Sequence, residues 1–178
     1  MSALLTFLAL FAVVIFQVTV SPLFPFSIAQ FDIPLVFVAW TTLFRGPKTA
    51  MWVVPVAAIL LGMLTFRSPA LFLLALLPVV PMIAISGVSY TNFLLGNYWR
   101  SLLVVMVAGA WARTLFALAA IAQGADPAFG TLVGSIIIPG IFLDGTLLTL
   151  AFAPSRLIGL DVANMALTRG GYTAYERS

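Results

Sequence analysis

Two consecutive apolar segments each carry one charged residue at a depth where a membrane helix would cross hydrocarbon. The segment 101–123 contains Arg113 near its middle, and the segment 131–153 contains Asp144 past its middle. A charged side chain at bilayer depth is costly, so such residues face the protein interior and pair with one another. Because these two charges are opposite in sign, the sequence predicts an Arg113–Asp144 ion pair inside an assembled helical bundle.

The composition indicates an integral membrane protein. Of 178 residues, 63% are hydrophobic and 7% are charged, against roughly a quarter charged in soluble domains. A membrane helix needs about 20 apolar residues. The predicted fold is therefore an all-α bundle of about six transmembrane helices with a short tail at 154–178, and the expected spans are 3–20, 28–44, 50–66, 70–87, 101–123 and 131–153.

Two of these spans are irregular. The continuous apolar part of the second, Pro34 to Phe44, is short for a membrane crossing. That span is expected to begin before Asp32, or to be tilted or shielded by its neighbours. The fourth contains Pro78 and Pro81, and each proline removes a backbone donor, so this span is expected to kink or break near its centre.

The basic residues predict the orientation of the chain. Basic residues are enriched on the cytoplasmic side of membrane proteins. If the N-terminus is cytoplasmic, only Arg67 lies outside. Six basic residues then lie on the cytoplasmic side: Arg45, Lys48, Arg100, Arg156, Arg169 and Arg177. Both termini are therefore predicted to be cytoplasmic, with the first four of these six as the main topology determinants.

The tail after Pro154 contains polar residues at Asp161, Asn164 and Thr168. Offsets of three and four place them on one stripe, as in a helix lying at the membrane surface. A cytoplasmic docking segment is the alternative interpretation.

The missing residue types exclude several kinds of chemistry. The chain has no cysteine and no histidine, which removes thiolate nucleophiles, imidazole metal ligands and the usual general base. It also lacks a glycine-rich phosphate loop and a metal-ligand cluster. We therefore expect no catalytic residues, no metal, no cofactor and no nucleic-acid partner. For Arg113 and Asp144, a structural pair is favoured over a proton or ion pathway, because one pair with no histidine, glutamate or second aspartate nearby makes a poor relay.

Three small residues before Arg113 indicate a close helix contact. Ala108, Gly109 and Ala112 fall on one side of the segment 101–123, and small residues let two membrane helices approach closely. The helix that packs against these residues could belong to this bundle or to a partner protein.

Several short motifs resemble those of the rod shape-determining protein MreD family. They are Phe16-Gln17 at the end of the first span, Asp32-Ile-Pro34-Leu-Val-Phe in the second, the turn Arg45-Gly-Pro-Lys48, the stretch Leu60-Leu61-Gly62-Met63-Leu64, and the region of Pro139. The resemblance is strongest from Gln17 to Ala70. The chain departs from the family pattern where Asp32 precedes Pro34, and at Thr65, where an acidic residue is often found.

The resemblance implies a non-catalytic scaffold subunit of the bacterial cell-shape machinery in the cytoplasmic membrane. Its implied partner is an MreC-like single-span protein with a coiled coil. Through that partner it would serve peptidoglycan synthesis, alongside the glycan polymerase/transpeptidase pair and the MreB filament. The family fold is similar to the substrate-binding subunits of energy-coupling-factor transporters, so a small-molecule uptake subunit is the second hypothesis.

Overall fold

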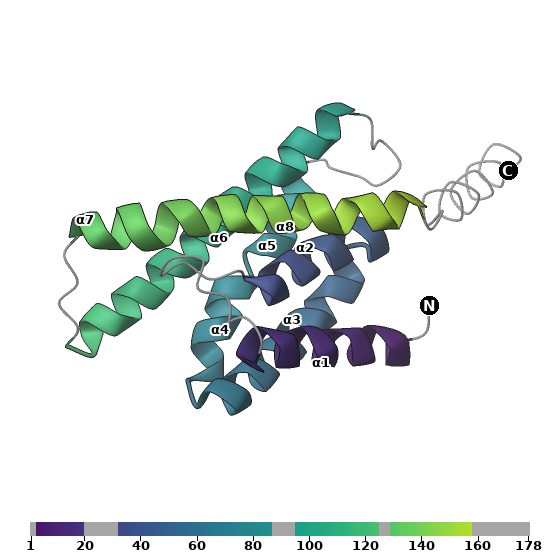
Figure 1. Ribbon diagram of the computed structural model, residues 1–178. Helices are drawn as coiled ribbons and strands as arrows, with labels where there is room; N and C mark the ends of the chain where they lie inside the picture. The colour runs from purple at the N-terminus through teal and green to yellow at the C-terminus, as the bar shows by residue number, and fades with distance from the viewer. Residues whose placement is uncertain (1–2, 20–31, 87–94, 125–128, 158–178) are drawn as a thin grey trace, which may run out of the picture.

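The computed structural model describes residues 3–19, 32–86, 95–124 and 129–157, and every regular element in these ranges is helical. The predicted all-α class is confirmed for this part of the chain. In order (Figure 1), the elements are α1 (Ala3–Thr19), α2 (Ile33–Arg45), α3 (Pro47–Thr65), α4 (Pro69–Leu76), α5 (Val79–Ile85), α6 (Leu95–Ala122), α7 (Phe129–Thr131), a π-helical stretch (Leu132–Ile137) and α8 (Ile138–Leu157).

Three helical stretches are long enough and apolar enough to cross a membrane: Pro47–Thr65, Trp99–Ala122 and Leu132–Ala151. The other three apolar stretches, Leu4–Thr19, Ile33–Arg45 and Pro69–Ile85, are shorter. Helices thus occupy all six ranges in which spans were expected. The first turn of α1 and the last turn of α8 lie on the same side of the molecule, at the right in Figure 1.

Helix α2 is the most enclosed element of the bundle. Its helix begins at Ile33, and the expected start of the span before Asp32 lies outside the described residues. Its 13 residues give a length of only about 20 Å at ~1.5 Å per residue. It packs against α1, α3, α5, α6 and α8, and it lies between α1 and α8 in Figure 1. The expected shielding is therefore present, and neighbouring helices cover a segment too short to cross ~30 Å of hydrocarbon unaided.

The buried hydroxyl groups of α2 are satisfied within the helix itself. Thr41 donates to the carbonyl of Phe37, and Thr42 donates to that of Val38. A buried hydroxyl without a partner is destabilising. These bonds let α2 carry two threonines through the core without recruiting another helix.

The expected break in the fourth span lies between α4 and α5, at Leu77 and Pro78. Pro78 has no N–H, so the carbonyl of Leu74 loses its usual partner four residues later. The indole N–H of Trp111 on α6 donates to this carbonyl at 3.1 Å. A neighbouring helix thereby satisfies the backbone at the break, as proline-containing membrane helices require.

The last two long helices extend beyond the predicted boundaries. Helix α6 begins at Leu95, before the expected start of the fifth span at residue 101. Helix α8 continues through Pro154 to Leu157, beyond the expected end of the sixth span at residue 153. The π-helical stretch precedes Pro139, whose ring crowds the preceding turn of a regular helix, so the wider turn accommodates it. The interfacial helix expected in the tail lies outside the described residues.

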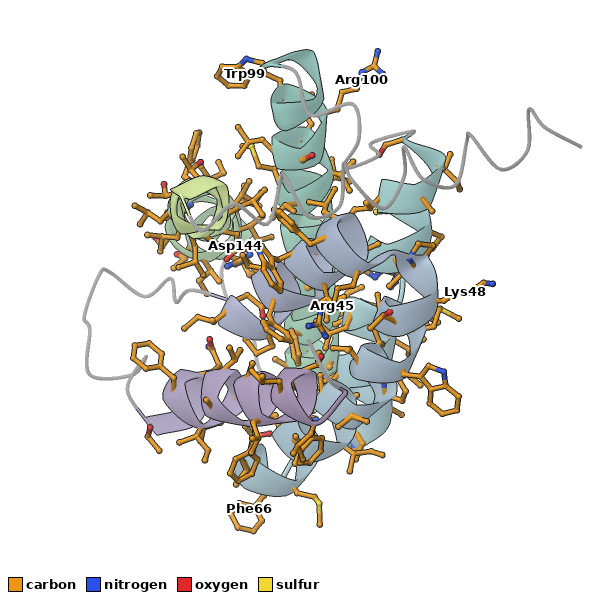
Figure 2. The ribbon with its side chains drawn as sticks, turned by 90° about the vertical axis from the view of Figure 1, so that its right-hand side faces the viewer. Arg45, Lys48, Phe66, Trp99, Arg100 and Asp144 are labelled. Carbon is orange, nitrogen blue, oxygen red and sulfur yellow. The ribbon has the colours of Figure 1, made fainter. Side chains whose placement is uncertain are left out.

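A tight turn joins α3 to α4. Phe66 adopts a left-handed conformation with φ of 55°, and the N–H of Arg67 bonds to the carbonyl of Gly62. This is a Schellman-type helix end. A Cβ at Gly62 would lie 2.6 Å from Cγ of Pro69, so the glycine permits the close return of the chain. Phe66 projects outward at the edge of the molecule in Figure 2, and the turn places Arg67 beside the start of α4.

The predicted topology determinants occupy helix ends. Arg45 ends α2, and its guanidinium donates to the hydroxyl of Thr6 on α1. Lys48, near the start of α3, and Arg100, in α6, are exposed and project outward in Figure 2. Arg156 lies in the last turn of α8, while Arg169 and Arg177 fall outside the described residues. Arg45 therefore also ties two helices together, a role that its charge alone did not predict.

Candidate functional site: a buried polar centre

Arg113 on α6 and Asp144 on α8 form the expected contact. The guanidinium engages both carboxylate oxygens, through Nη1 to Oδ2 and through Nη2 to Oδ1, the latter at 3.1 Å. Nη1 also donates to the carbonyl of Gly109. The side chains are 9% and 0% exposed. A two-pronged arginine–carboxylate pair of this kind fixes direction as well as distance, so it specifies how α6 and α8 cross.

Asp144 also holds the start of α2. Its Oδ1 accepts the backbone N–H of Asp32 at 2.9 Å. On α1, Gln17 Oε1 accepts the next N–H, that of Ile33, at 3.1 Å. The carboxylate of Asp32 caps the helix by accepting the N–H of Leu35. The first N–H groups of a helix have no partner within it, and here side chains from α1, α2 and α8 supply the acceptors.

We refer to Gln17, Asp32, Arg113 and Asp144 as the polar centre. In Figure 2, Asp144 points from α8 toward the middle of the molecule. The positive end of the α2 dipole favours a carboxylate at this position. Buried ionic groups are tolerated when each is paired and hydrogen-bonded. Arg113 and Asp144 meet this condition, and the polar centre joins four helices in one network.

Two glycines make room for the ion pair. A Cβ at Gly109 would lie 2.6 Å from Oδ2 of Asp144, and a Cβ at Gly140 would overlap Nε of Arg113. Gly109 precedes Arg113 by four residues, and Gly140 precedes Asp144 by four. Each glycine therefore lies one turn before a charged residue on its own helix. The charged side chain of the other helix fills the space beside it, Asp144 at Gly109 and Arg113 at Gly140.

The small-residue face of α6 packs inside the bundle. Ala108 and Ala112 are 0% exposed, and Gly109 lies against Asp144. Of the two alternatives, a helix of this bundle occupies the face. At Gly109 that helix is α8, whose Asp144 carboxylate fills the space beside the glycine.

Sequence reasoning missed three members of this site. Gln17 was noted only in the family resemblance. Asp32 was noted there and at the start of the second span, and Gly140 was included only in the region of Pro139. A signal for Asp32 was present, because an aspartate before Ile33-Pro34 is a typical helix start. The shared spacing of a glycine four residues before each intramembrane charge was a signal for Gly140. The acceptor role of Gln17 depends on how α1 packs, and nothing in its local sequence reveals it.

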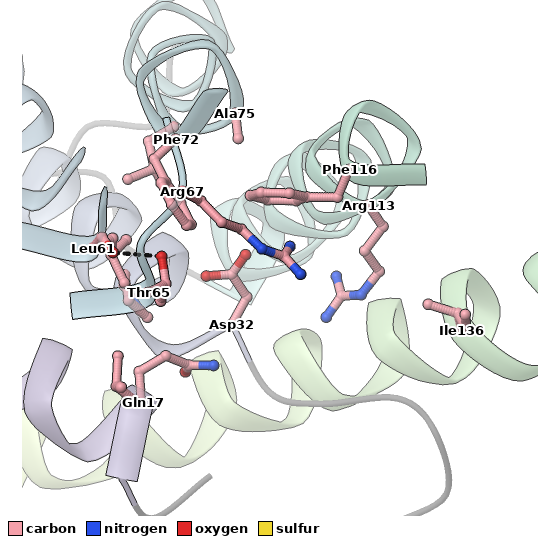
Figure 3. A pocket seen from close by; sticks show the side chains of 13 residues that line it. Gln17, Asp32, Leu61, Thr65, Arg67, Phe72, Ala75, Arg113, Phe116 and Ile136 are labelled. Carbon is pink, nitrogen blue, oxygen red and sulfur yellow. Dashed lines mark hydrogen bonds between the residues drawn. The ribbon is translucent and has the colours of Figure 1, made fainter. Parts of the chain in front are cut away.

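A cavity of about 640 Å³ adjoins the polar centre. Its polar lining comes from Gln17, Asp32, Thr65, Arg67 and Arg113. Its apolar lining includes Phe72 on α4 and Phe116 on α6, whose ring centroids lie 5.3 Å apart. In Figure 3 the side chains of Asp32, Arg67 and Arg113 point toward the same part of this cavity. Its size is within the ~300–1,000 Å³ range typical of small-molecule sites.

No protein-family model matches this chain, and neither a curated protein nor a solved structure matches it.

Proposed function

We propose that this protein is a multi-pass subunit of the bacterial cytoplasmic membrane that acts as a non-catalytic scaffold of the cell-shape machinery. In this proposal it resembles the rod shape-determining protein MreD family and binds an MreC-like single-span partner. It would support peptidoglycan synthesis together with the glycan polymerase/transpeptidase pair and the MreB filament.

The polar centre is the observation that carries the proposal. Its charged groups are engaged in holding helices together, through the Arg113–Asp144 pair and the start of α2. Gln17 and Asp32, which belong to the motifs of the resemblance, lie in this network. A scaffold needs a bundle of fixed geometry rather than a reactive group, and a buried hydrogen-bonded network provides that geometry.

Co-isolation from the native host would test the scaffold. We expect a single-span protein with a coiled coil to co-purify with the tagged chain in mild detergent. A matched purification of an unrelated membrane protein of similar size provides the control. Recovery of the chain with ATPases and a coupling membrane protein, and without the single-span protein, would contradict the scaffold.

That contradicting outcome defines the second candidate function, the substrate-binding subunit of an energy-coupling-factor type transporter. The cavity of about 640 Å³ with its converging polar side chains favours it, because such a subunit requires a pocket with several polar groups. We prefer the scaffold function, since the network around Asp144 gives a structural role to the motif residues Gln17 and Asp32. An uptake subunit would not require this network.

The proposed topology has six passes with both termini cytoplasmic. The same-side placement of the start of α1 and the end of α8 supports an even number of passes. Reporter fusions after Ser178 and within residues 124–130 are expected to report opposite sides of the membrane, the cytoplasm for the first and the exterior for the second. If both fusions reported the same side, the six-pass arrangement would be wrong.

A further inference from the structure

We propose that the cavity beside the polar centre binds a zwitterionic ligand that carries an ammonium group, a phosphate or carboxylate, and an apolar body. The proposal does not depend on the scaffold function. Its basis is the combination of separated charges and apolar walls in one cavity lined by α1, α2, α3, α4, α6 and the turn at Arg67.

Arg67 and Asp32 carry opposite charges, and neither charge forms an ion pair in the described part of the chain. There, Arg67 forms no side-chain hydrogen bond or ion pair, and the carboxylate of Asp32 forms no ion pair. The carboxylate accepts one backbone N–H, from Leu35, which leaves further acceptor capacity on a group with about four lone-pair sites. The guanidinium can bind an anion, and the carboxylate can bind an ammonium group.

The sum of the charges selects a zwitterion over a simple anion or cation. Arg113 is compensated by Asp144, and Arg67 is formally compensated by Asp32, so the four charges add to zero. The Arg113–Asp144 pair beside the cavity is buried, whereas Arg67 is exposed. A guest with net charge would leave an uncompensated charge beside that buried pair, which is unfavourable. A guest with one positive and one negative group leaves none.

The apolar walls predict the rest of the ligand. Phe72 and Phe116 face each other with a tilted ring arrangement, and Leu61, Leu76 and Ile136 line the cavity with them. Such walls favour a hydrocarbon group attached to the charged head. An ethanolamine phospholipid headgroup and a free zwitterion with an apolar side chain share this chemistry.

Native mass spectrometry of the full chain would test the proposal, with phosphatidylethanolamine and phosphatidylglycerol supplied separately in detergent. We expect one retained phosphatidylethanolamine and at least ten-fold weaker retention of phosphatidylglycerol, which lacks the ammonium group. Arg67→Gln should weaken phosphatidylethanolamine retention at least ten-fold. Asp32→Asn should abolish the preference between the two lipids. Asparagine still serves as a helix cap, and a melting curve for each variant reports folding independently.

A second arm distinguishes the two sources of the ligand. Free phosphoethanolamine and free leucine are added to the purified protein, and the melting temperature is measured. A rise with either compound, lost in Arg67→Gln, identifies a free zwitterion, whereas retention of the lipid alone identifies a headgroup. The control is Arg100→Gln, an exposed arginine outside the cavity. The proposal is overturned if the wild-type protein binds none of these probes. It is also overturned if the Arg67→Gln variant binds them as tightly as the wild-type protein or the Arg100→Gln control does. The co-isolation result for the scaffold is unaffected by either outcome.

Discussion

Arg113→Leu and Asp144→Leu are each expected to lower the free energy of unfolding by about 3–5 kcal/mol, because each leaves an unpaired charge in the interior. Both partners are nearly inaccessible, at 9% and 0% exposure, so water cannot replace the lost interaction. Denaturant titration of the detergent-purified variants, followed by tryptophan fluorescence, would measure the change.

The double variant Arg113→Leu/Asp144→Leu is expected to recover much of this loss but not all of it. Asp144 also accepts the N–H of Asp32, and the double variant leaves that donor without an acceptor. A buried donor without a partner costs about 1–3 kcal/mol, which is the residual deficit we expect. Damage in the double variant equal to the sum of the two single losses would show that the two residues are not coupled.

Gly140→Ala is expected to destabilise the protein by roughly 3 kcal/mol, comparable to the loss of one partner of a buried pair. The added methyl group would overlap Nε of Arg113 and displace the guanidinium from Asp144. The matched control is Gly134→Ala in the adjacent π-helical stretch, where a Cβ meets no atom within 4 Å. The control should be neutral or slightly stabilising, because alanine exceeds glycine in helix propensity by about 1 kcal/mol.

Combining Gly140→Ala with Arg113→Leu isolates the cause of this loss. If the methyl group acts through the guanidinium, Gly140→Ala should cost much less once Arg113 is leucine. Residues in contact show such non-additivity, whereas independent sites add. An undiminished cost would assign the effect of Gly140→Ala to backbone distortion near Pro139 instead.

The all-α class and the Arg113–Asp144 contact could be predicted because they depend on local information. Apolar runs of sufficient length specify helices, and two opposite charges in hydrocarbon have few alternatives to each other. The Pro78 break followed from chemistry that is equally local. Helix boundaries were less accessible: α6 begins at Leu95 because helix formation does not stop where hydrophobicity falls, and no residue type near Arg100 ends it.

The identity of the helices that cover α2, and the contacts of Gln17 and Asp32 in the polar centre, could not be predicted from the sequence, for a different reason. The burial of α2 depends on its being covered by helices distant in the chain. The acceptors of its first N–H groups include Gln17 and Asp144, which lie 16 and 112 positions from their donors. Spacing rules cannot detect bonds across such separations, because they describe neighbours on a single helix.

The bond between Asp32 and Asp144 has a consequence for the order of assembly during synthesis. Residues 32 and 144 are made 112 positions apart, and elongation proceeds at about 5–20 residues per second. For several seconds, therefore, the second helix exists without one of its acceptors and without the helix that supplies it. Being only 13 residues long, it has little hydrophobic length with which to remain inserted alone. In the proposed membrane topology, stable insertion of α2 therefore waits for the translation of α8.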